Sequence, residues 1–460
     1  MPNVTAVLLA AGQGTRMKSS HPKVLHEILG RPMIAYLVDA LKSRGMADIL
    51  AVVGYQAEKV QAALAPYGLR FVLQEPQQGT GHAVQVALPA APPETETVMV
   101  LCGDVPLISG ESIDNLYQLH QQSGAAVTVQ TVELPDGAHY GRVVRDDTGQ
   151  VRDVVQVKDA AHRPDILAIR EINTGAYCFD AAFLRQALSE LTVSPVTGEI
   201  YLTDMIALAR RHGRGVEALL DPDWENLLGI NSRRELAQAT RVLRRRINEA
   251  HMAAGVTLMD PEATFIGPLV TIGRDTVIYP NVFLEGETSI GENCRLEPQV
   301  LIRDSHLADG VIVKMGSVIE GSRIGPGADV GPMARLRPGS ELKSRVHIGN
   351  FVEVKKSVLH EGVKAGHLTY LGDAEVGAGV NVGAGTITCN YDGVQKHRTV
   401  IEDGAFIGSN TALVAPVTVG EGAYIGAGST ITEDVPSGKL AIARGRQVIL
   451  TRKKQPGAPD

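Results

Sequence analysis

The chain has 460 residues, of which 44% are hydrophobic and 4% aromatic, and its formal net charge is −7. This length favours two domains, and the negative balance provides no basic surface for nucleic acid or for an anionic membrane. No charged leader followed by an apolar stretch opens the sequence, and the four cysteines lack CxxC or disulfide spacing. We therefore expect a soluble cytoplasmic protein that neither binds nucleic acid nor inserts into a membrane.

Strand and helix patterns alternate in the first half of the chain. Helical spacing that stops at glycine marks residues 34–45 and 57–68. Continuous apolar runs that predict strands lie at 4–9, 49–53, 70–73, 97–101 and 126–132. The alternation predicts an α/β domain, Rossmann-like, with a mostly parallel sheet.

A linker helix is predicted between the two halves. Residues 232–254 are rich in arginine, have helical spacing and are followed by Gly255. We interpret the arginines as a solvated helix face rather than as a ligand site. The chain is thus expected to comprise a first domain over 1–231, this helix, a second domain over 255–451 and a disordered tail over 452–460.

Aliphatic residues recur at every sixth position in the second half, a period that suits a solenoid of short strands and tight corners rather than a helix. Glycine often follows them, as expected where the backbone turns or approaches closely. This register resembles the left-handed parallel β-helix of hexapeptide-repeat proteins, and an ordinary β-sandwich is the weaker alternative. The three runs are Ile266, Ile272, Ile278, Leu284, Ile290, Leu296 and Ile302; Val318, Ile324, Val330, Leu336, Leu342, Ile348 and Val354; and Ile407, Leu413, Val419, Ile425 and Ile431.

A glycine-rich loop at the end of the first predicted strand suggests phosphate binding. Backbone amides can approach a phosphate there, and Arg16 and Lys23 can neutralise a triphosphate and the leaving pyrophosphate. The stretch LAAGQGTRM followed by PKVL resembles the signature of sugar-1-phosphate nucleotidyltransferases. The resemblance implies that this loop, with Leu9, Ala10, Ala11 and Gly12, holds the nucleotide.

Two further segments indicate which nucleotide binds and suggest a metal ion. LQEPQQGTGHA resembles the uracil-recognising segment of that family, which implies nucleotide contacts by Gln74, Gly79 and Thr80 and favours uridine over adenosine. A predicted strand ends at Asp104 in the segment LCGDVPLI, which also contains Cys102 and Gly103. The Asp104 carboxylate is suited to bind Mg²⁺ but could equally cap a helix. The resemblance supplies Asn231 as the second metal ligand.

Segments that resemble the sugar side of the site follow. YGRVV, EINTG and YLTD imply that Gly141 and Asn173 contact the sugar. Gln156 stands where the family commonly has glutamate, in VVQVKDA. Glutamine retains an acceptor but loses the charge, so either sugar affinity differs or the glutamate is not essential.

The second half carries polar residues that a purely structural solenoid would not need. Arg337 and Lys355, expected on adjacent coils, form a phosphate clamp, and His367 lies between them and a segment where the sixfold register lapses. Interruptions of a solenoid form loops that carry sites. Other polar residues of this region are Tyr370, Asn381, Asn390, Tyr391 and Lys396.

Nearly the whole chain resembles the bifunctional bacterial enzymes that acetylate glucosamine-1-phosphate from acetyl-coenzyme A and join N-acetylglucosamine-1-phosphate to UMP from UTP. The segments KAGHLTYLGD and GAGTITCNYDG are the most specific. The resemblance implies a homotrimer with acetyl-transfer sites between subunits, and UDP-N-acetylglucosamine production for peptidoglycan and lipopolysaccharide. It further implies His367 as general base; a sugar-phosphate site of Arg337, Lys355, Tyr370 and Asn381; and acetyl-coenzyme A contacts from Ala384, Asn390, Tyr391, Ser409, Ala427 and Arg444.

Two alternatives remain at the level of sequence. One is a sugar-1-phosphate nucleotidyltransferase whose β-helix is purely structural, which would not require the group around His367. The other is a non-catalytic regulatory subunit, which would be expected to lose Asp104, Asn231, Arg16 and Lys23. All of these residues are present.

Overall fold

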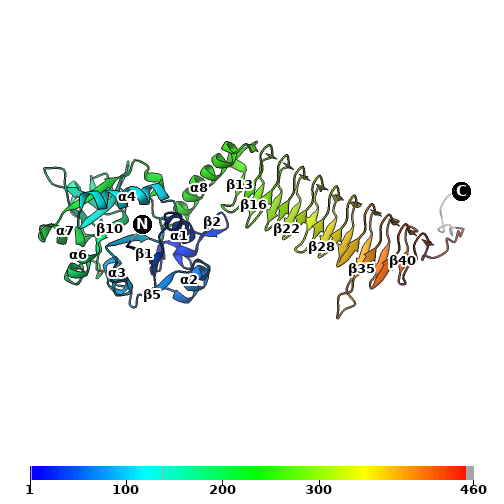
Figure 1. Ribbon diagram of the computed structural model, residues 1–460, viewed down its shortest axis with the longest axis horizontal. Helices are drawn as coiled ribbons and strands as arrows, with labels where there is room; N and C mark the ends of the chain where they lie inside the picture. Colours follow the sequence, from blue (N-terminus) through cyan, green and yellow to red (C-terminus); the bar gives the residue numbers. More distant parts are fainter. Residues whose placement is uncertain (2, 138, 452–460) are drawn as a thin grey trace, which may run out of the picture. The chain divides into compact units, whose positions relative to one another are not determined.

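The computed structural model describes residues 1, 3–137 and 139–451, so the predicted tail over 452–460 lies outside the described residues. The chain divides into two compact units, Met1–Leu243 and the part that begins at Arg244. The division falls inside helix α8 (Arg233–Ala253), coloured green in Figure 1. Each unit has its own core.

The first unit is an α/β domain with a mostly parallel central sheet, as predicted. β10 is antiparallel to both of its neighbours in this sheet, whereas the other adjacent pairs are parallel. The strand order is β11 (Val216–Leu220), β7 (Val127–Glu133), β10 (Glu171–Asp180), β6 (Thr97–Cys102), β1 (Val4–Ala10), β4 (Asp48–Val53) and β5 (Arg70–Leu73). The hairpin of β8 (Arg142–Arg145) and β9 (Val151–Val155) joins this sheet through β10, and β2 (Glu27–Ile28) with β3 (Arg31–Pro32) forms a separate two-stranded sheet.

Helices flank the sheet on both sides (Figure 1). The predicted helix at 34–45 is α1, and that at 57–68 is α2 followed by a 3₁₀ turn over Ala65–Tyr67. Pro66 cannot continue an α-helix because it lacks a backbone donor, which explains the early end of α2. The α-helices of this unit are α1 (Met33–Ser43), α2 (Ala57–Leu64), α3 (Thr80–Ala87), α4 (Gly110–Ser123), α5 (Pro164–Leu167), α6 (Ala181–Ala187), α7 (Asp204–Arg211) and the first part of α8.

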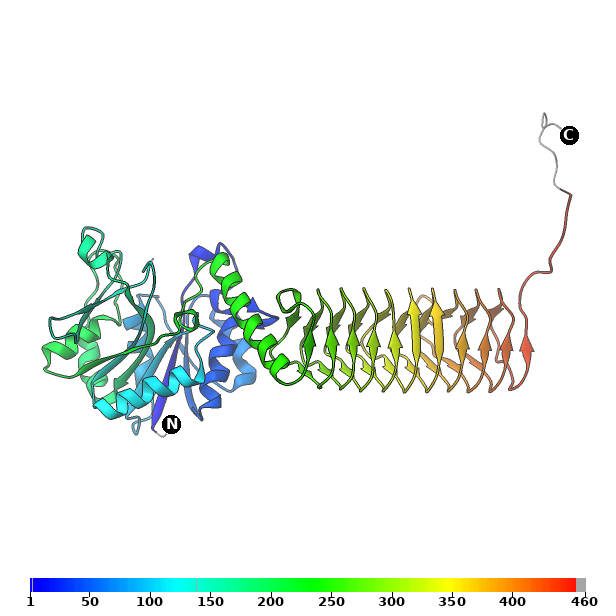
Figure 2. The ribbon, with the colours of Figure 1, turned by 90° about the horizontal axis from the view of Figure 1, so that it is seen from above.

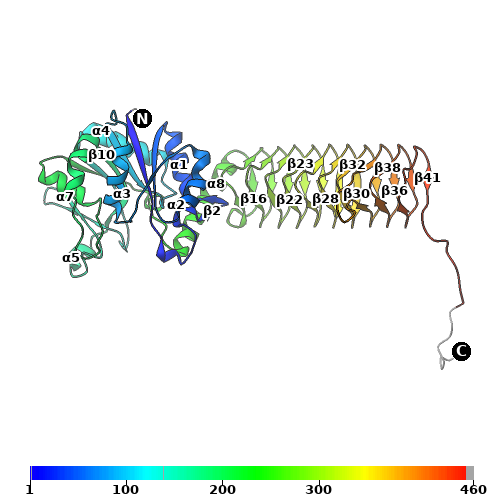
Figure 3. The ribbon, with the colours of Figure 1, turned by 90° about the horizontal axis from the view of Figure 1, so that it is seen from below.

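The second unit is a parallel β-helix, the architecture expected of left-handed hexapeptide-repeat proteins. Its strands stack coil upon coil in three parallel sheets (Figures 2 and 3). The first sheet contains β12 (Thr257–Leu258), β15 (Val277–Ile278), β18 (Arg295–Leu296), β21 (Ile312–Val313), β24 (Asp329–Val330), β27 (His347–Asn350), β30 (Lys364–His367), β33 (Asn381–Val382), β36 (Phe406–Ile407), β39 (Tyr424–Ile425) and β41 (Leu440–Ala441). The second contains β13 (Phe265–Ile266), β16 (Phe283–Glu285), β19 (Leu301–Arg303), β22 (Val318–Glu320), β25 (Arg335–Leu336), β28 (Glu353–Lys355), β31 (Tyr370–Gly372), β34 (Ile387–Cys389), β37 (Ala412–Val414) and β40 (Thr430–Ile431). The third contains β14 (Thr271–Ile272), β17 (Ser289–Ile290), β20 (His306–Leu307), β23 (Arg323–Ile324), β26 (Glu341–Leu342), β29 (Val358–Leu359), β32 (Ala374–Val376), β35 (Thr399–Ile401) and β38 (Val417–Val419).

The sixfold aliphatic residues form the core of the β-helix, with Ile272 packed against it as a partly exposed member, and one of them needs correction. Val318 is only half-buried, and its neighbour Ile319 occupies the core instead. Ile302 pairs with Ile319, because the side from Ile302 to Leu307 has five residues rather than six. The side from Ile319 to Ile324 is likewise five residues long, so the period of six slips before the second run and again at its first step.

Some of the glycines that follow the aliphatic residues allow neighbouring coils to approach each other closely. A β-carbon added at Gly349 would overlap the carbonyl of Gly366 on the next coil, and one added at Gly273 would lie 2.6 Å from the Glu292 nitrogen. Neither glycine has a positive φ. Close coil spacing, not a left-handed backbone conformation, therefore requires glycine at these two positions.

Candidate active sites

The ends of β1 and β6 support a cleft in the first unit. Residues 11–14 leave β1, and two 3₁₀ turns then carry Arg16 (Thr15–Met17) and Lys23 (Lys23–Leu25). Gly14 has a φ of 67°, and a β-carbon there would lie 2.6 Å from that of Lys23. The glycine therefore permits Lys23 to approach the loop.

Lys23 lies at the centre of a polar cluster. Its ammonium donates to Asp104 Oδ2 and, at 2.6 Å, to Asn231 Oδ1. Arg16 donates to the same Asn231 oxygen at 2.8 Å. The backbone N–H of Ile230 donates to the Asp104 carbonyl at 2.8 Å and ties the two ligand-bearing segments together. One oxygen of Asp104 and one of Asn231 thus face the same position, which the Lys23 ammonium occupies.

The chemistry of this donor set fits Mg²⁺. The Lys23 ammonium is a stand-in cation between one carboxylate oxygen and one amide oxygen. Among residues 1, 3–137 and 139–451, no three His, Cys, Asp or Glu side chains gather as a fuller metal cluster. Mg²⁺ commonly takes one or two protein oxygens and completes its shell with water and substrate phosphates.

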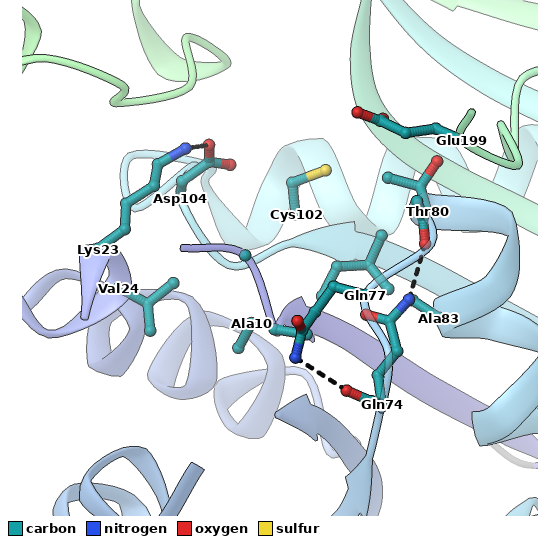
Figure 4. A pocket seen from close by; sticks show the side chains of 14 residues that line it. Ala10, Lys23, Val24, Gln74, Gln77, Thr80, Ala83, Cys102, Asp104 and Glu199 are labelled. Carbon is teal, nitrogen blue, oxygen red and sulfur yellow. Dashed lines mark hydrogen bonds and ion pairs between the residues drawn. The ribbon is translucent and has the colours of Figure 1, made fainter. Parts of the chain in front are cut away.

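Gln74, the residue predicted to contact the nucleotide, lines one end of the cleft with the residues near it (Figure 4). Gln74 is buried, and its Nε2 donates to the Gly79 carbonyl at 2.9 Å. The backbone carbonyl of Gln74 accepts from Gln77 Nε2 at 3.1 Å. The bond to the Gly79 carbonyl orients the Gln74 side-chain amide just before α3, which begins at Thr80.

The predicted sugar contacts lie together on the other side of the cleft. Asn173 on β10 donates its backbone N–H to the Gly141 carbonyl at 2.9 Å. Gln156 Nε2 donates to Thr203 Oγ1 at 3.3 Å. Behind Thr203, burial and the nearby Asp153 and Asp159 raise the pKa of Asp204 to about 6.

Three cavities with shared lining residues make this cleft continuous. Their volumes are about 290, 620 and 250 Å³. Lys23 lines the first two, Asp104 the first and third, and Asn231 the second and third. The predicted residues Leu9, Ala10, Ala11, Gly12, Gln74, Gly79, Thr80, Cys102, Gly141, Gln156 and Asn173 line at least one, while Gly103 lies between Cys102 and Asp104.

Sequence reasoning missed part of this lining. Glu199 borders all three cavities, and His139 and Tyr201 border two. Burial and the Arg16 charge lower the pKa of His139. Tyr201 belongs to the YLTD segment, which resembles the sugar side of the site, whereas Glu199 and His139 lie in loops with no distinguishing pattern.

A column of residues on the β-helix contains His367. Its Nδ1 lies 2.7 Å from Asn350 Oδ1 on the preceding coil. The coils that follow are joined by Asn410 N–H to the Ala384 carbonyl (2.7 Å), Gly428 N–H to the Ser409 carbonyl (2.8 Å) and the Arg444 guanidinium to the Ala427 carbonyl (2.6 Å). With adjacent strands about 4.8 Å apart, this column of mostly small residues suits an extended ligand that begins near His367.

A second column carries cations on the next sheet. Arg337 donates its backbone N–H to the Val354 carbonyl, which places Lys355 on the following coil. Lys355 Nζ lies 4.0 Å from Asp373 Oδ2, and Asn390 donates to the same carboxylate. The nearby Lys355 ammonium lowers the pKa of Lys396. Lys396 was not among the predicted sugar-phosphate residues, because a loop that reverses direction brings it back to Lys355.

The other predicted residues have distinct places. Tyr370 begins β31 on the cationic sheet, directly after the corner that follows His367. Asn381 lies on the sheet of His367, in register with Lys364 rather than with His367 itself. Tyr391 is exposed in the loop before β35, which extends away from the stack in Figure 1.

Two family models match parts of the chain. Residues 6–168 match a MobA-like NTP transferase domain, and residues 398–433 match the bacterial transferase hexapeptide with six repeats. In the part of the chain that the structure describes, no helix has the length and apolar character needed to cross a membrane.

Full-length relatives are similar along almost the entire chain. The bifunctional protein GlmU of Heliobacterium modesticaldum is 53% identical over 445 residues, which cover 97% of this chain and 96% of the relative. The proteins of the same name from Pelobacter propionicus and Trichlorobacter lovleyi are each 50% identical, with 97% of both chains covered. Both the nucleotidyltransferase unit and the β-helix fall within these matches. The chain therefore belongs to the bifunctional GlmU family.

Proposed function

We propose that the two units catalyse two reactions of UDP-N-acetylglucosamine synthesis. The β-helix transfers an acetyl group from acetyl-coenzyme A to glucosamine-1-phosphate. The α/β unit then transfers UMP from UTP to N-acetylglucosamine-1-phosphate and releases pyrophosphate. The observation that carries this proposal is the presence of two polar clusters on separate units, one around Lys23 and one around His367.

In uridylyl transfer, a phosphate oxygen of the sugar attacks the α-phosphorus of UTP. Arg16 and Lys23 stabilise charge on the transferred group and on the departing pyrophosphate. Asp104 and Asn231 would hold Mg²⁺, which would supply further positive charge there. Gln74 Oε1 accepts from the uracil N3–H, and Gly141, Gln156 and Asn173 bind the sugar.

In acetyl transfer, the sugar amine must lose a proton to attack the thioester carbon. Because Asn350 Oδ1 accepts from His367 Nδ1, the ring proton resides on Nδ1 and the Nε2 lone pair is free to take the amine proton. Arg337, Lys355 and Lys396 provide cations for the sugar phosphate. The column of Ala384, Ser409, Ala427 and Arg444 holds coenzyme A.

A homotrimer with acetyl-transfer sites between subunits is part of this proposal. Asn381 lies on a different sheet from the cations Arg337 and Lys355, and His367 is exposed in the single chain. Apposition of β-helices from neighbouring subunits would bring these faces together and cover the exposed apolar residues Ile387 and Phe406. We expect the assembly in the cytoplasm, where its product supplies peptidoglycan and lipopolysaccharide synthesis.

The test is to follow both reactions separately on the purified full-length chain. Glucosamine-1-phosphate with acetyl-coenzyme A should release thiol, and N-acetylglucosamine-1-phosphate with UTP and Mg²⁺ should release pyrophosphate. Chelation of Mg²⁺ should stop only the second reaction. If thiol release does not occur while pyrophosphate release does, the β-helix is structural and the proposal of two activities is wrong.

A further inference from the structure

The start of α8 is joined directly to the polar cluster around Lys23. Ser232 precedes the first helical residue, and its hydroxyl accepts from the backbone N–H of Glu235 at 3.3 Å. The Glu235 carboxylate accepts from the Ser232 hydroxyl at 2.9 Å. A serine followed three residues later by glutamate is the sequence pattern of a helix capping box.

The second half of this capping box differs from the usual arrangement. In the usual box, the glutamate accepts from the backbone N–H of the capping serine itself. Here Glu235 Oε2 accepts from the backbone N–H of Asn231, one residue earlier, at 2.7 Å. The shorter of these two hydrogen bonds of the carboxylate is therefore made with the residue whose side chain faces Asp104 and Lys23.

The remaining contacts of Asn231 define the direction of its side chain. Nδ2 donates to the Gly229 carbonyl at 3.3 Å, which turns Oδ1 toward Lys23 and Arg16. The neighbouring Ile230 N–H is bound to the Asp104 carbonyl. Glu235 is the contact that fixes the backbone of Asn231 from the helix side.

We propose that Glu235 is a positioning residue for the metal-binding oxygen of Asn231. The inference rests on the proposed function, in which Asp104 and Asn231 hold Mg²⁺. Glu235 acts through the Asn231 backbone and does not itself reach the metal. Loss of outer-sphere partners of this kind typically weakens metal affinity 10- to 100-fold.

A purely structural role of Glu235 in helix capping would give a different result. Ser232→Ala and Glu235→Ala both remove part of the capping box, so both should lower the melting temperature by a similar amount. Only Glu235→Ala removes the acceptor of the Asn231 N–H. Ser232→Ala is therefore the matched control, and Glu235→Gln, which keeps an acceptor at the same length, is the conservative rescue.

The experiment measures Mn²⁺ binding to the full-length chain by electron paramagnetic resonance, in the presence of UDP-N-acetylglucosamine. We expect Glu235→Ala to raise the Mn²⁺ dissociation constant about tenfold or more, with Ser232→Ala close to the wild type and Glu235→Gln intermediate or close to it. Glu235→Asp, whose shorter side chain cannot reach Asn231, replaces the alanine variant if that variant does not fold.

Asp104→Ala separates failure of this inference from failure of the proposed function. If Asp104→Ala leaves Mn²⁺ binding intact, the metal site is not where we propose it and both proposals fail. If Asp104→Ala abolishes binding but Glu235→Ala binds like the wild type, the positioning role alone is wrong. Equal weakening in Ser232→Ala and Glu235→Ala would likewise assign Glu235 to helix capping only.

Discussion

His367 illustrates how one hydrogen bond sets the chemistry of a side chain. Asn350 lies one coil away and presents Oδ1 at 2.7 Å from the imidazole Nδ1. An acceptor at Nδ1 selects the tautomer with a free lone pair on Nε2. The ring is thereby prepared to accept a proton at the exposed face of the β-helix.

Replacement of His367 by alanine should lower acetyl-transfer turnover by roughly 10²–10⁴-fold, the usual contribution of a positioned general base. The loss should shrink as the pH rises, because more of the substrate amine is then already neutral. Turnover across pH and the melting temperature should be measured on one preparation. A variant with full turnover but lower thermal stability would contradict the catalytic role.

Asp204 gives a pH dependence of stability in the first unit. Burial and two neighbouring carboxylates raise its pKa from 3.8 to about 6 in the folded chain, so the folded state disfavours the charged form. Its favourable contribution is complete below pH about 4 and is lost as the pH rises through about 6. Asp204→Asn removes this titration.

The stability of Asp204→Asn relative to wild type should therefore improve between pH 4 and pH 8. We expect a change of about 1 kcal/mol, which is below the full linkage for two pKa units because the side chain is partly exposed to solvent. Urea unfolding of both proteins at the two pH values measures it. A difference that is the same at both pH values would show that Asp204 does not titrate in this range.

At the scale of the element, the spacing of coils in the β-helix is set by glycines that admit no side chain. Gly349 and Gly366 lie on adjacent coils, and neither has a positive φ. A β-carbon at Gly349 would overlap the Gly366 carbonyl, whereas one at Gly366 would meet nothing within 4 Å. The pair therefore separates crowding between coils from the intrinsic effect of glycine.

Gly349→Ala should destabilise the β-helix by about 3 kcal/mol, because overpacking forces the backbone of a coil to move. Gly366→Ala should change the stability by less than about 1 kcal/mol. Chemical denaturation of the full-length variants, followed by circular dichroism, compares them. Similar stability of the two variants would show that the coils can separate at little cost.

The period of the β-helix was predictable from sequence, but its phase was not. Inward-facing residues must be aliphatic, so strands and core follow from the sixfold pattern. Val318 and Ile319 are both aliphatic, and the two five-residue sides, one before Leu307 and one before Ile324, decide which one faces inward. The sequence pattern cannot reveal a shortened side of a coil when either of two neighbouring residues is apolar enough to be buried in the core.

The candidate sites were predictable to the extent that their residues lie in recognisable segments. Asp104 and Gln74 belong to such motifs. The contact between Lys396 and Lys355 depends on how a loop folds back, and the bond from Asn231 to Glu235 depends on one side-chain rotamer. These contacts are properties of tertiary structure that residue identity alone does not specify.

At the scale of the whole molecule, the division into two units predicts separable activities. Leu236, Ala239 and Val242 of α8 pack with Ile28 and Met33 of the first unit. A fragment that ends at residue 231, the boundary expected from sequence, would remove this layer of the core. A fragment that ends at Leu243 retains it.

The fragment over residues 1–243 should therefore catalyse uridylyl transfer without acetyl transfer, and should melt at a higher temperature than the fragment over 1–231. Pyrophosphate release and thermal denaturation of the two fragments test this. A 1–243 fragment that is folded but inactive would show that the first unit depends on the β-helix.

The most direct test of the account is a complementation assay with two full-length variants, Asp104→Ala and His367→Ala, supplied with glucosamine-1-phosphate, acetyl-coenzyme A, UTP and Mg²⁺. Asp104→Ala should release thiol and accumulate N-acetylglucosamine-1-phosphate, whereas His367→Ala should form UDP-N-acetylglucosamine only when the acetylated sugar is added. A mixture of the two variants should restore the complete sequence of reactions. Loss of both activities in either folded variant would contradict two independent sites on one chain.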